Sequence, residues 1–250
     1  MHALMQTFFD RLSTKVGLDE TESAAIASCC SEVISVGADI EIIPQGSEPD
    51  RLHLLLEGWA YRYVLLPDGR RHISTLLLAG DFCDLDALRV KRLKFGVATL
   101  GACRIAGLSR TALHGVMERH PRVAQAFLSL AIAENEVLTR WNLSLGRQTA
   151  KERLAFLFCE LVFRLLGSDH SDPEGKIVFP INQAELGDVL GLSTVHVNRV
   201  LQDLRARKLI ELCSDELRIL DWKGLASLAY FAASYLSVDG ENSPRPMAVF

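Results

Sequence analysis

Long apolar stretches are missing from this 250-residue sequence, because no run approaches the ~20 residues that a membrane-spanning helix needs. The opening residues, MHALMQTFFDRLSTK, also lack the layout of a secretory signal peptide. We therefore expect a cytoplasmic protein. Hydrophobic residues make up 49% of the sequence, which excludes general disorder and allows two domains with cores of their own.

Motifs of the common catalytic and nucleotide-binding sites are missing as well. The sequence has no G-x-S-x-G, no H-E-x-x-H, no Walker or Rossmann loop, and no carboxylate pair that can be placed as general acid and base. We therefore expect that the protein is not an enzyme.

The six cysteines contain no C-x-x-C pair, so neither a zinc site nor an iron–sulfur cluster is indicated. They are scattered along the chain as Cys29, Cys30, Cys83, Cys103, Cys159 and Cys213. Buried, reduced thiols are the simplest interpretation.

Positive charge is not in excess, since 27 basic residues stand against 31 acidic ones and the formal net charge is −4. Such a protein is not expected to coat nucleic acid non-specifically. Residues 193–210 depart from this average, because four basic residues there oppose one acidic residue. These are Arg199, Arg205, Arg207 and Lys208 against Asp203. A local basic face is therefore predicted within an acidic protein.

A β-rich region extends from residue 33 to about residue 108. Strand-like runs such as VISVG, RLHLLLEGWAYRYVLL, RRHISTLLLAGD and CRIAGLS alternate with turns that contain glycine. The turn at Pro67, Asp68 and Gly69 is a hairpin signal, because proline presets the first corner and glycine tolerates a left-handed one. This spacing favours a compact β-roll or barrel over a parallel α/β sheet.

Helices flank this region. A short helix over residues 109–120 is expected to stop at Pro121 and to lead into a long helix, residues 122 to about 145. The long helix has an apolar stripe of coiled-coil spacing, formed by Val123, Phe127, Leu130, Leu138, Trp141 and Leu145 and interrupted by Glu134 and Asn135. The stripe needs a partner, and the simplest is a second copy in a two-fold dimer. The alternative is that it packs wholly on its own β-domain.

A hinge is predicted after the long helix. Thr149 and Glu152 form a capping-box signature before an apolar helix, residues 154–166. A loop rich in Gly, Ser, Asp and Pro follows.

Two short helical patterns then meet at a tight turn in the segment 182–208, NQAELGDVLGLSTVHVNRVLQDLRARK. Gly191 can take a positive φ, and Ser193 can cap the second helix. Leu192 can fill the corner, and Gly187 lets the two helices approach closely. The pattern is typical of a helix-turn-helix that presents polar side chains to the major groove. The alternative is an ordinary helical hairpin whose polar face is solvated.

The segment LIELCSDELRIL is expected to form two strands, the wing of a winged helix, followed by a last helix over DWKGLASLAY. We predict an α+β fold with an N-terminal jelly-roll-like β-roll sensor domain, a long dimerisation helix, and a C-terminal winged helix-turn-helix. The predicted boundaries are 1–121 for the effector-sensing β-roll, 122–147 for the dimerisation helix, 148–227 for the DNA-binding domain, and 228–250 for a C-terminal extension that we expect to be mobile.

This order of parts resembles the Crp/Fnr family of bacterial transcription regulators over roughly residues 25–225. The resemblance is carried by IPQGSEPDRLHLLLEGWAYRY, PDGRR and LLAGDF in the β-rich region and by ELGDVLGLSTVHVNRVLQDLRARKLIEL in the helix-turn-helix. It implies a cyclic nucleotide-binding-like domain, a homodimer on a pseudo-palindromic promoter site in duplex DNA, and contact with RNA polymerase.

The resemblance also places an effector pocket, with departures from the cyclic AMP-binding branch. That branch has a motif like F-G-E-L for the ribose and R-S-A for the phosphate, where this sequence has FCDL at residues 82–85 and KFG at residues 94–96. Lysine and phenylalanine do not replace a bidentate arginine and a hydroxyl, so cyclic AMP is disfavoured and the effector is unidentified. The effector-pocket candidates are Cys83, Asp84, Leu85, Lys94, Phe95 and, on the long helix, Thr139.

Other cofactors leave no clear signature. The oxygen-sensing branch carries an N-terminal cysteine cluster, which the adjacent Cys29 and Cys30 cannot reproduce, and no histidine stands in a haem motif. Cys83 lies beside the pocket segment and raises the alternative of a thiol-switched regulator. An effector-independent regulator and a small-molecule sensor that acts through protein partners are further alternatives.

For DNA, the resemblance implies a recognition helix that reads base edges with a glutamate and an arginine. Arg199 matches the arginine and can bind O6 and N7 of a guanine, but Val195 stands at the glutamate position. Valine can contact a thymine methyl group but cannot accept a hydrogen bond from cytosine, so we expect a half-site that differs opposite Val195. The expected DNA-binding residues are Ser193, Thr194, Val195, His196, Asn198 and Arg199.

Overall fold

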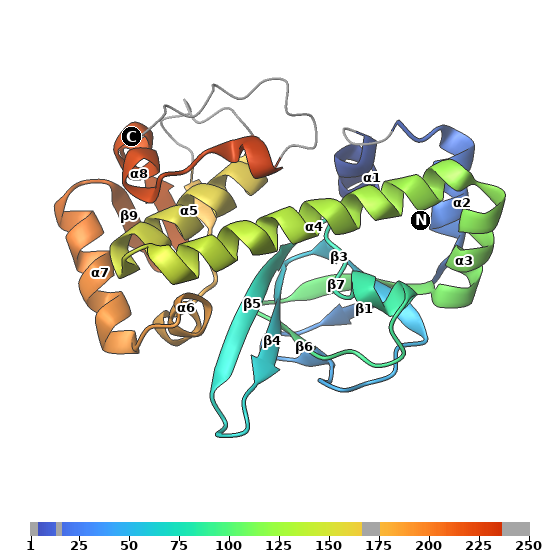
Figure 1. The fold of residues 1–250 in the computed structure, drawn as a ribbon, viewed down its shortest axis with the longest axis horizontal. Coiled ribbons are helices and arrows are strands. Elements are labelled where there is room, and N and C mark those ends of the chain that lie inside the picture. Colours follow the sequence, from blue (N-terminus) through green and yellow to red (C-terminus); the bar gives the residue numbers. More distant parts are fainter. Residues whose placement is uncertain (1–4, 14–16, 167–175, 237–250) are drawn as a thin grey trace. The chain divides into compact units, whose positions relative to one another are not determined.

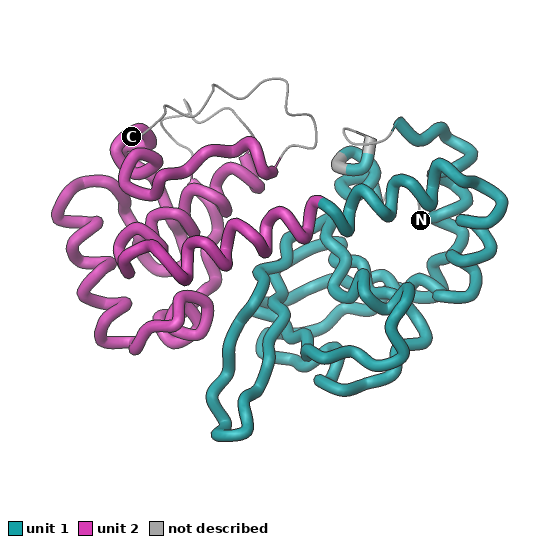
Figure 2. The backbone as a smooth tube through the Cα atoms, viewed as in Figure 1, with its two compact units in different colours: residues 1–132 teal, residues 133–250 magenta. Residues whose placement is uncertain are grey.

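The computed structural model describes residues 5–13, 17–166 and 176–236, in two compact units that divide between residues 132 and 133 (Figure 2). The division falls inside one helix, α4 (Pro121–Arg147), which therefore belongs to both units (Figure 1). In the described part of the chain, none of the helices combines the length and the apolar character that crossing a bilayer requires.

The first unit is built on two antiparallel sheets, with strand orders β1-β7-β3 and β2-β6-β4-β5. The strands are β1 (Cys30–Val36), β2 (Glu41–Ile43), β3 (Arg51–Glu57), β4 (Trp59–Leu65), β5 (Arg71–Leu78), β6 (Gly96–Thr99) and β7 (Cys103–Ser109). The β-roll predicted for residues 33–108 is confirmed.

The hairpin between β4 and β5 is closed as its residues predict. Gly69 has a φ of +85°, and its amide donates to the Leu66 carbonyl at 2.9 Å. The Leu66 amide donates to the Arg70 carbonyl at 2.8 Å, which completes the turn.

Helices cover one side of the roll and complete its core. They are α1 (Gln6–Ser13), α2 (Glu20–Ser28), the short 3-10 helix η2 (Leu85–Leu88), α3 (Arg110–Arg119) and the first part of α4. Their buried side chains, which include Phe8, Leu12, Ile26, Leu113 and Val123, pack on Leu52 and Leu54 of β3. A separate core lies between the sheets and includes Leu55, Leu77, Val97 and Ile105.

Most of the stripe that was expected to face a second copy is packed by the helix's own chain. Val123 and Phe127 are 0% and 3% exposed in the core of the first unit. Trp141 meets the Phe156 ring edge-on, with centroids 5.3 Å apart, in the second unit. The dimer role expected of this stripe stays a prediction, but Val123 and Phe127 are not available to a second copy, because helical periodicity locates an apolar stripe and not the side chains that cover it. The alternative, that the stripe packs wholly on its own β-domain, is also incomplete, because Trp141 packs in the second unit.

A different face of α4 is uncovered. Leu128, Ile132 and Leu143 are 61%, 51% and 49% exposed. Because these residues recur at nearly whole turns, they lie along one side of the helix.

The second unit contains the predicted winged helix-turn-helix. Its helices are α5 (Ala150–Leu166), α6 (Gln183–Leu190), α7 (Thr194–Ala206) and α8 (Trp222–Ala229), and a short 3-10 helix, η3 (Ala233–Leu236), follows. The wing consists of β9 (Ile210–Cys213) and β10 (Glu216–Ile219), and β8 (Lys176–Val178) extends it in the order β8-β10-β9.

The predicted capping box opens α5. The Thr149 amide donates to Glu152 Oε2 at 2.8 Å, and the Glu152 amide donates to Thr149 Oγ1 at 3.4 Å. The helix then buries every residue from Leu154 to Val162, so α5 is the centre of the second unit.

The extension predicted to be mobile, residues 228–250, is only partly described. Within residues 228–236, α8 continues to Ala229 and η3 packs on α5. Aromatic side chains within these residues pack against α5. Residues 237–250, and residues 167–175 of the predicted loop, lie outside the described part of the chain.

Candidate nucleic-acid interface

The first helix of the helix-turn-helix has both ends fixed by its sequence. At its start, Asn182 Oδ1 accepts from the amides of Ala184 and Glu185 at 2.9 and 3.0 Å. Glu185 Oε2 accepts from the Asn182 amide at 2.8 Å, which completes a capping box. At its end, Gly191 adopts the left-handed conformation, with φ +65°.

The turn after this helix is closed against Gly187. The Leu192 amide donates to the Gly187 carbonyl at 3.0 Å. A Cβ atom on Gly187 would lie 2.6 Å from the Leu192 carbonyl oxygen. Because that oxygen belongs to the backbone, it cannot move without moving the turn. The prediction that Gly187 allows close approach is confirmed.

The second helix, α7, separates a buried face from an exposed one. Val197, Val200, Leu201 and Leu204 are buried. Ser193 caps the helix by accepting from the His196 amide at 3.3 Å. Thr194, Val195 and His196 are exposed at its start, and the exposed fraction of Val195 reaches 72%.

Arg199 is exposed one turn further along α7. Within the described part of the chain, its guanidinium has no hydrogen-bond or ion-pair partner. The aliphatic face of α7 is therefore buried, and the Arg199 side chain near the start of the helix is exposed to solvent. This arrangement can supply a bidentate donor to a base edge.

Asn198 differs from its neighbours. It is half-buried, and its Nδ2 donates to Gln183 Oε1 of α6 at 3.2 Å. The structure therefore uses Asn198 to join the two helices, a role that the sequence analysis did not predict.

Three contacts involve side chains near the end of α7. Asp203 pairs with Lys151 of α5 at 2.6 Å and with Arg207 at 3.1 Å. Hydrogen bonding from Lys151 keeps the pKa of the Asp203 carboxyl below its usual range, with the charge of Arg207 contributing further. Arg205 Nη2 donates to the Leu212 carbonyl of β9 at 2.8 Å and so ties α7 to the wing.

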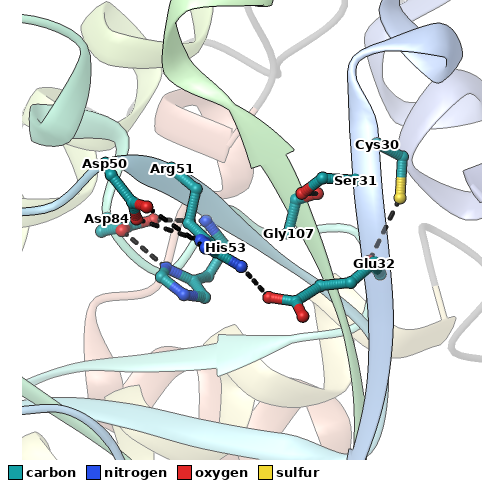
Figure 3. Close-up of polar contacts among 8 residues, drawn as sticks. All are labelled: Cys30, Ser31, Glu32, Asp50, Arg51, His53, Asp84 and Gly107. Carbon is teal, nitrogen blue, oxygen red and sulfur yellow. Dashed lines mark hydrogen bonds and ion pairs between the residues drawn. The ribbon is translucent and has the colours of Figure 1, made fainter.

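The candidate effector segment, residues 82–85, lies in the first unit, and Asp84 there contacts His53 of β3. Its side chain is fully buried. Oδ1 accepts from the His53 amide at 2.7 Å, and Oδ2 lies 2.9 Å from His53 Nδ1 (Figure 3). Each carboxylate oxygen therefore has a hydrogen-bond partner on β3.

Figure 3 also shows polar contacts of residues that lie on or next to β1, β3 and β7. Arg51 pairs with Asp50 at 3.0 Å and with Glu32 of β1. Ser31 Oγ donates to the Gly107 carbonyl at 3.0 Å. These contacts join β1, β3 and β7 along the sheet.

Arg62 holds the same segment from within the roll. It is 4% exposed, and its Nε and Nη2 donate to the carbonyls of Cys83 and Phe82 at 2.6 and 3.1 Å. Its guanidinium also lies 4.9 Å from the centre of the Phe95 ring. Burial lowers the pKa of the Arg62 guanidinium, while the charges of nearby acidic groups oppose this. An internal cation thus joins two of the predicted pocket segments.

Three other effector-pocket candidates, Leu85, Lys94 and Thr139, are not brought together in this way. Leu85 is buried in the helix-covered core, and Lys94 is exposed. Thr139 is exposed on the part of α4 that belongs to the second unit. Cys83 is fully buried, and burial raises the pKa of its thiol well above its ordinary value. A thiol switch at Cys83 therefore lacks an accessible thiolate.

Models of two known domains match the chain. The cyclic nucleotide-binding domain matches residues 33–120, and the Crp-like helix-turn-helix domain matches residues 152–228. The transcriptional activatory protein AadR of Rhodopseudomonas palustris is 30% identical over 183 residues, which cover 72% of this chain and 74% of that protein. This chain belongs to the Crp/Fnr family of transcription regulators.

Other Crp/Fnr proteins agree with this assignment. The nitrogen fixation regulation protein FixK of Azorhizobium caulinodans is 24% identical over 220 residues, which cover 88% of both chains. The structure of FixK2 from Bradyrhizobium japonicum has a TM-score of 0.71 at 24% identity, and the match covers 79% of this chain and 96% of that chain. A transcriptional regulator of the CRP family from Thermus thermophilus has a TM-score of 0.63 at 23% identity, covering 79% and 97%. The fold of this Crp/Fnr regulator is therefore that of the family.

Three residues of this Crp/Fnr chain were missed by sequence reasoning. His53, Arg62 and Gln183 each bind a predicted site segment from another element. A charged residue within the apolar run of β4 was a usable signal for Arg62, since a buried arginine needs several acceptors. No local pattern indicated His53, which binds a residue 31 positions away.

Proposed function

We propose that this Crp/Fnr regulator binds a pseudo-palindromic promoter site as a homodimer, with α7 of each chain in the major groove. The observation that carries the proposal is the exposed start of α7, where Arg199 is available and the opposite face is buried. By family resemblance, the DNA-bound dimer contacts RNA polymerase, works in the cytoplasm and acts as a regulator rather than as an enzyme.

The half-site follows from the exposed residues. Arg199 is proposed to bind O6 and N7 of a guanine, a contact that discriminates by about 1–3 kcal/mol. Val195, exposed and apolar, is proposed to contact a thymine methyl group. Ser193, Thr194 and His196 lie at the helix start, where phosphate contacts are favoured by the helix N-terminus. Asn198 contributes by holding Gln183, not by a base contact of its own.

The dimer is proposed to form through the uncovered face of α4. Leu128, Ile132 and Leu143 expose between 49% and 61% of their surfaces in the single chain. A row of large apolar side chains on one long helix is matched best by the same row on a second copy. This face replaces the stripe that the sequence analysis had favoured.

The effector is proposed not to be cyclic AMP. The Asp84 carboxylate is already bound by His53, and Arg62 donates to the backbone of the segment that would face the nucleotide. These contacts favour a roll that is closed by its own side chains.

Substitution of Arg199 tests the DNA proposal. Arg199→Ala should weaken binding to a selected operator by about 10- to 100-fold, because a bidentate base contact is lost. Binding to unrelated duplex should change much less. Arg89→Ala is the matched control, because Arg89 is also exposed but lies in the β-roll unit. Unchanged operator binding by Arg199→Ala in a gel-shift titration would contradict the proposal.

Substitution of Ile132 tests the dimer. Ile132→Glu places charge within the uncovered α4 face and should convert the dimer to a monomer in sedimentation velocity. Leu65→Glu is the control, because Leu65 is similarly exposed, at 49%, but lies on the β4–β5 hairpin. A wild-type protein that sediments as a monomer, on and off DNA, would refute the homodimer.

A further inference from the structure

After α8, the chain turns back and packs against α5 of the same unit. Tyr230 ends the helix in the left-handed conformation, with φ +50°. The Phe231 amide donates to the Ala226 carbonyl at 2.9 Å, which fixes the turn. Because residues other than glycine adopt this conformation at a cost, contacts made by the next residues must stabilise the turn. Residues 230–236 lie beyond the 152–228 matched by the Crp-like helix-turn-helix domain.

Aromatic side chains of this segment complete the core around α5. Phe231 packs against Phe156 and Trp222, with ring centroids 5.9 Å apart in both pairs. Tyr235 stacks on Phe156 at 6.0 Å, and its hydroxyl donates to Glu160 Oε2 at 3.0 Å. Burial and the neighbouring carboxylate raise the pKa of the Tyr235 phenol, so the hydroxyl remains a donor. One face of Phe156 is therefore covered by the C-terminal segment.

The second half of α4 reaches the same place. Trp141 contacts Phe156 edge-on at 5.3 Å, and the Arg140 guanidinium lies 5.6 Å from the centre of the same ring. Arg140 Nη2 donates to the Tyr230 carbonyl at 2.8 Å. Just beyond α4, Gln148 Nε2 donates to the Ala229 carbonyl at 2.7 Å. The end of α4 is thus bound to the backbone at the point where the chain turns back.

We propose that residues 230–235 position the end of α4 on the helix-turn-helix unit, and that they thereby set the half-site spacing that the regulator accepts. The inference rests on the proposed homodimer. If α4 carries the dimer contact, the separation of the two α7 helices depends on how firmly each α7 unit is attached to its α4. Arg140 and Tyr235 are positioning residues in this scheme, since neither lies on the exposed face of α7.

DNA spacing is a sensitive reporter of this attachment. Each base pair inserted between half-sites moves one of them by about 3.4 Å and by about a tenth of a turn. A rigid dimer is penalised for the wrong spacing, whereas a loosened dimer can follow the shifted half-site. Loosening should therefore lower discrimination between spacings without altering how a single α7 binds its half-site.

The test compares two truncations and two point variants on a set of duplexes. One truncation ends at Ala229 and removes the segment, and the other ends at Leu236 and keeps it. Arg140→Ala removes the contact with Tyr230 by a substitution that is less disruptive to folding, and Arg147→Ala is its control on the same helix. The duplexes carry the selected palindrome, the palindrome with one or two base pairs inserted at its centre, or one half-site.

The wild type, the truncation at Leu236 and Arg147→Ala are expected to prefer the native spacing by about tenfold or more. The truncation at Ala229 and Arg140→Ala are expected to lose most of this preference, with half-site affinity and sedimentation unchanged. Retention of the wild-type preference by both variants overturns the inference, as does a loss of half-site affinity that parallels the loss for the palindrome. A wild type that does not prefer the palindrome to one half-site refutes the homodimeric function itself, and the inference with it.

Discussion

Replacing Gly187 by alanine is expected to destabilise the helix-turn-helix, although the same change usually stabilises a helix. Gly187 lies inside α6, where alanine is favoured over glycine by about 0.5–1 kcal/mol. The new Cβ atom, however, would lie 2.6 Å from the Leu192 carbonyl oxygen. Forcing an additional carbon into a packed site costs about 1–3 kcal/mol. The middle of these two ranges gives a net loss of about 1 kcal/mol in the free energy of unfolding, and their extremes give up to about 2.5 kcal/mol.

The same clash should affect DNA binding. Leu192 precedes the cap of α7, so a displaced turn also displaces Ser193 and the exposed start of that helix. Operator affinity should fall more than the loss of folded protein accounts for, because the remaining folded molecules present a shifted α7.

Gly115 in α3 provides the matched control. A Cβ atom there meets only the flexible end of Arg119 at 3.4 Å, an ordinary contact, so Gly115→Ala should gain about 0.5–1 kcal/mol. Urea unfolding followed by tryptophan fluorescence measures both variants, because Trp59 lies in the first unit and Trp141 and Trp222 lie in the second. If Gly187→Ala is stabilised as much as Gly115→Ala, the reasoning about the turn is refuted.

Three other predictions rest on the side-chain contacts. Asp84→Ala should lower the free energy of unfolding of the β-roll unit by about 1–3 kcal/mol, because the buried His53 amide loses its acceptor; a loss near zero in urea titration would show that the carboxylate is dispensable. Lys151 lowers the pKa of the Asp203 carboxyl from its ordinary 3.8, so the stabilising contribution of Asp203 is present above about pH 4 and disappears as the pH falls further. The difference in the free energy of unfolding between wild type and Asp203→Asn should therefore shrink in acid. A difference that grows in acid would contradict this prediction. With a thiol reagent near neutral pH, exposed Cys213 should react first. Cys83 and Cys159 should react only after unfolding, because burial raises the pKa of their thiols. Early labelling of Cys83 in the native protein, measured by mass spectrometry, would again favour a thiol-switched regulator.

The elements of this regulator could be predicted from the sequence because their signals are local. Turn residues such as Gly69, capping residues such as Asn182, and the paired helices around Gly191 each act within a few positions of the chain. Patterns of this kind fix the β-roll, the wing and the turn without knowledge of distant contacts.

The distribution of buried faces could not be predicted in the same way. Along α4, one apolar stripe contains Val123 and Phe127 and another contains Leu128 and Ile132. Both have helical spacing, and Val123 and Phe127 are covered because they join the core of the first unit. The periodicity therefore favoured a stripe of which the chain itself buries Val123 and Phe127 and leaves Leu138 exposed.

The partners of the buried polar side chains could not be predicted from the sequence either. β4 is buried at five successive positions, with a register shift between Arg62 and Tyr63, so an arginine within this apolar run indicates burial but does not indicate which carbonyls it binds. Asp84 was assigned from a motif, but its partner His53 comes from a distant strand. Motif comparison identifies a position, whereas the partner depends on the fold.

The continuity of α4 limits how genes for chimaeric regulators can be joined. The helix gives Val123 to one core and Trp141 to the other, so neither unit can be exchanged as a block that ends where the helix ends. A junction at Gln148 would leave Phe156 without the ring of Trp141 and Tyr230 without the guanidinium of Arg140. Recombinants that keep residues 133–147 with their own α5 should fold, provided that the joined helix preserves its phase, because one residue too many rotates everything beyond the junction by about 100°.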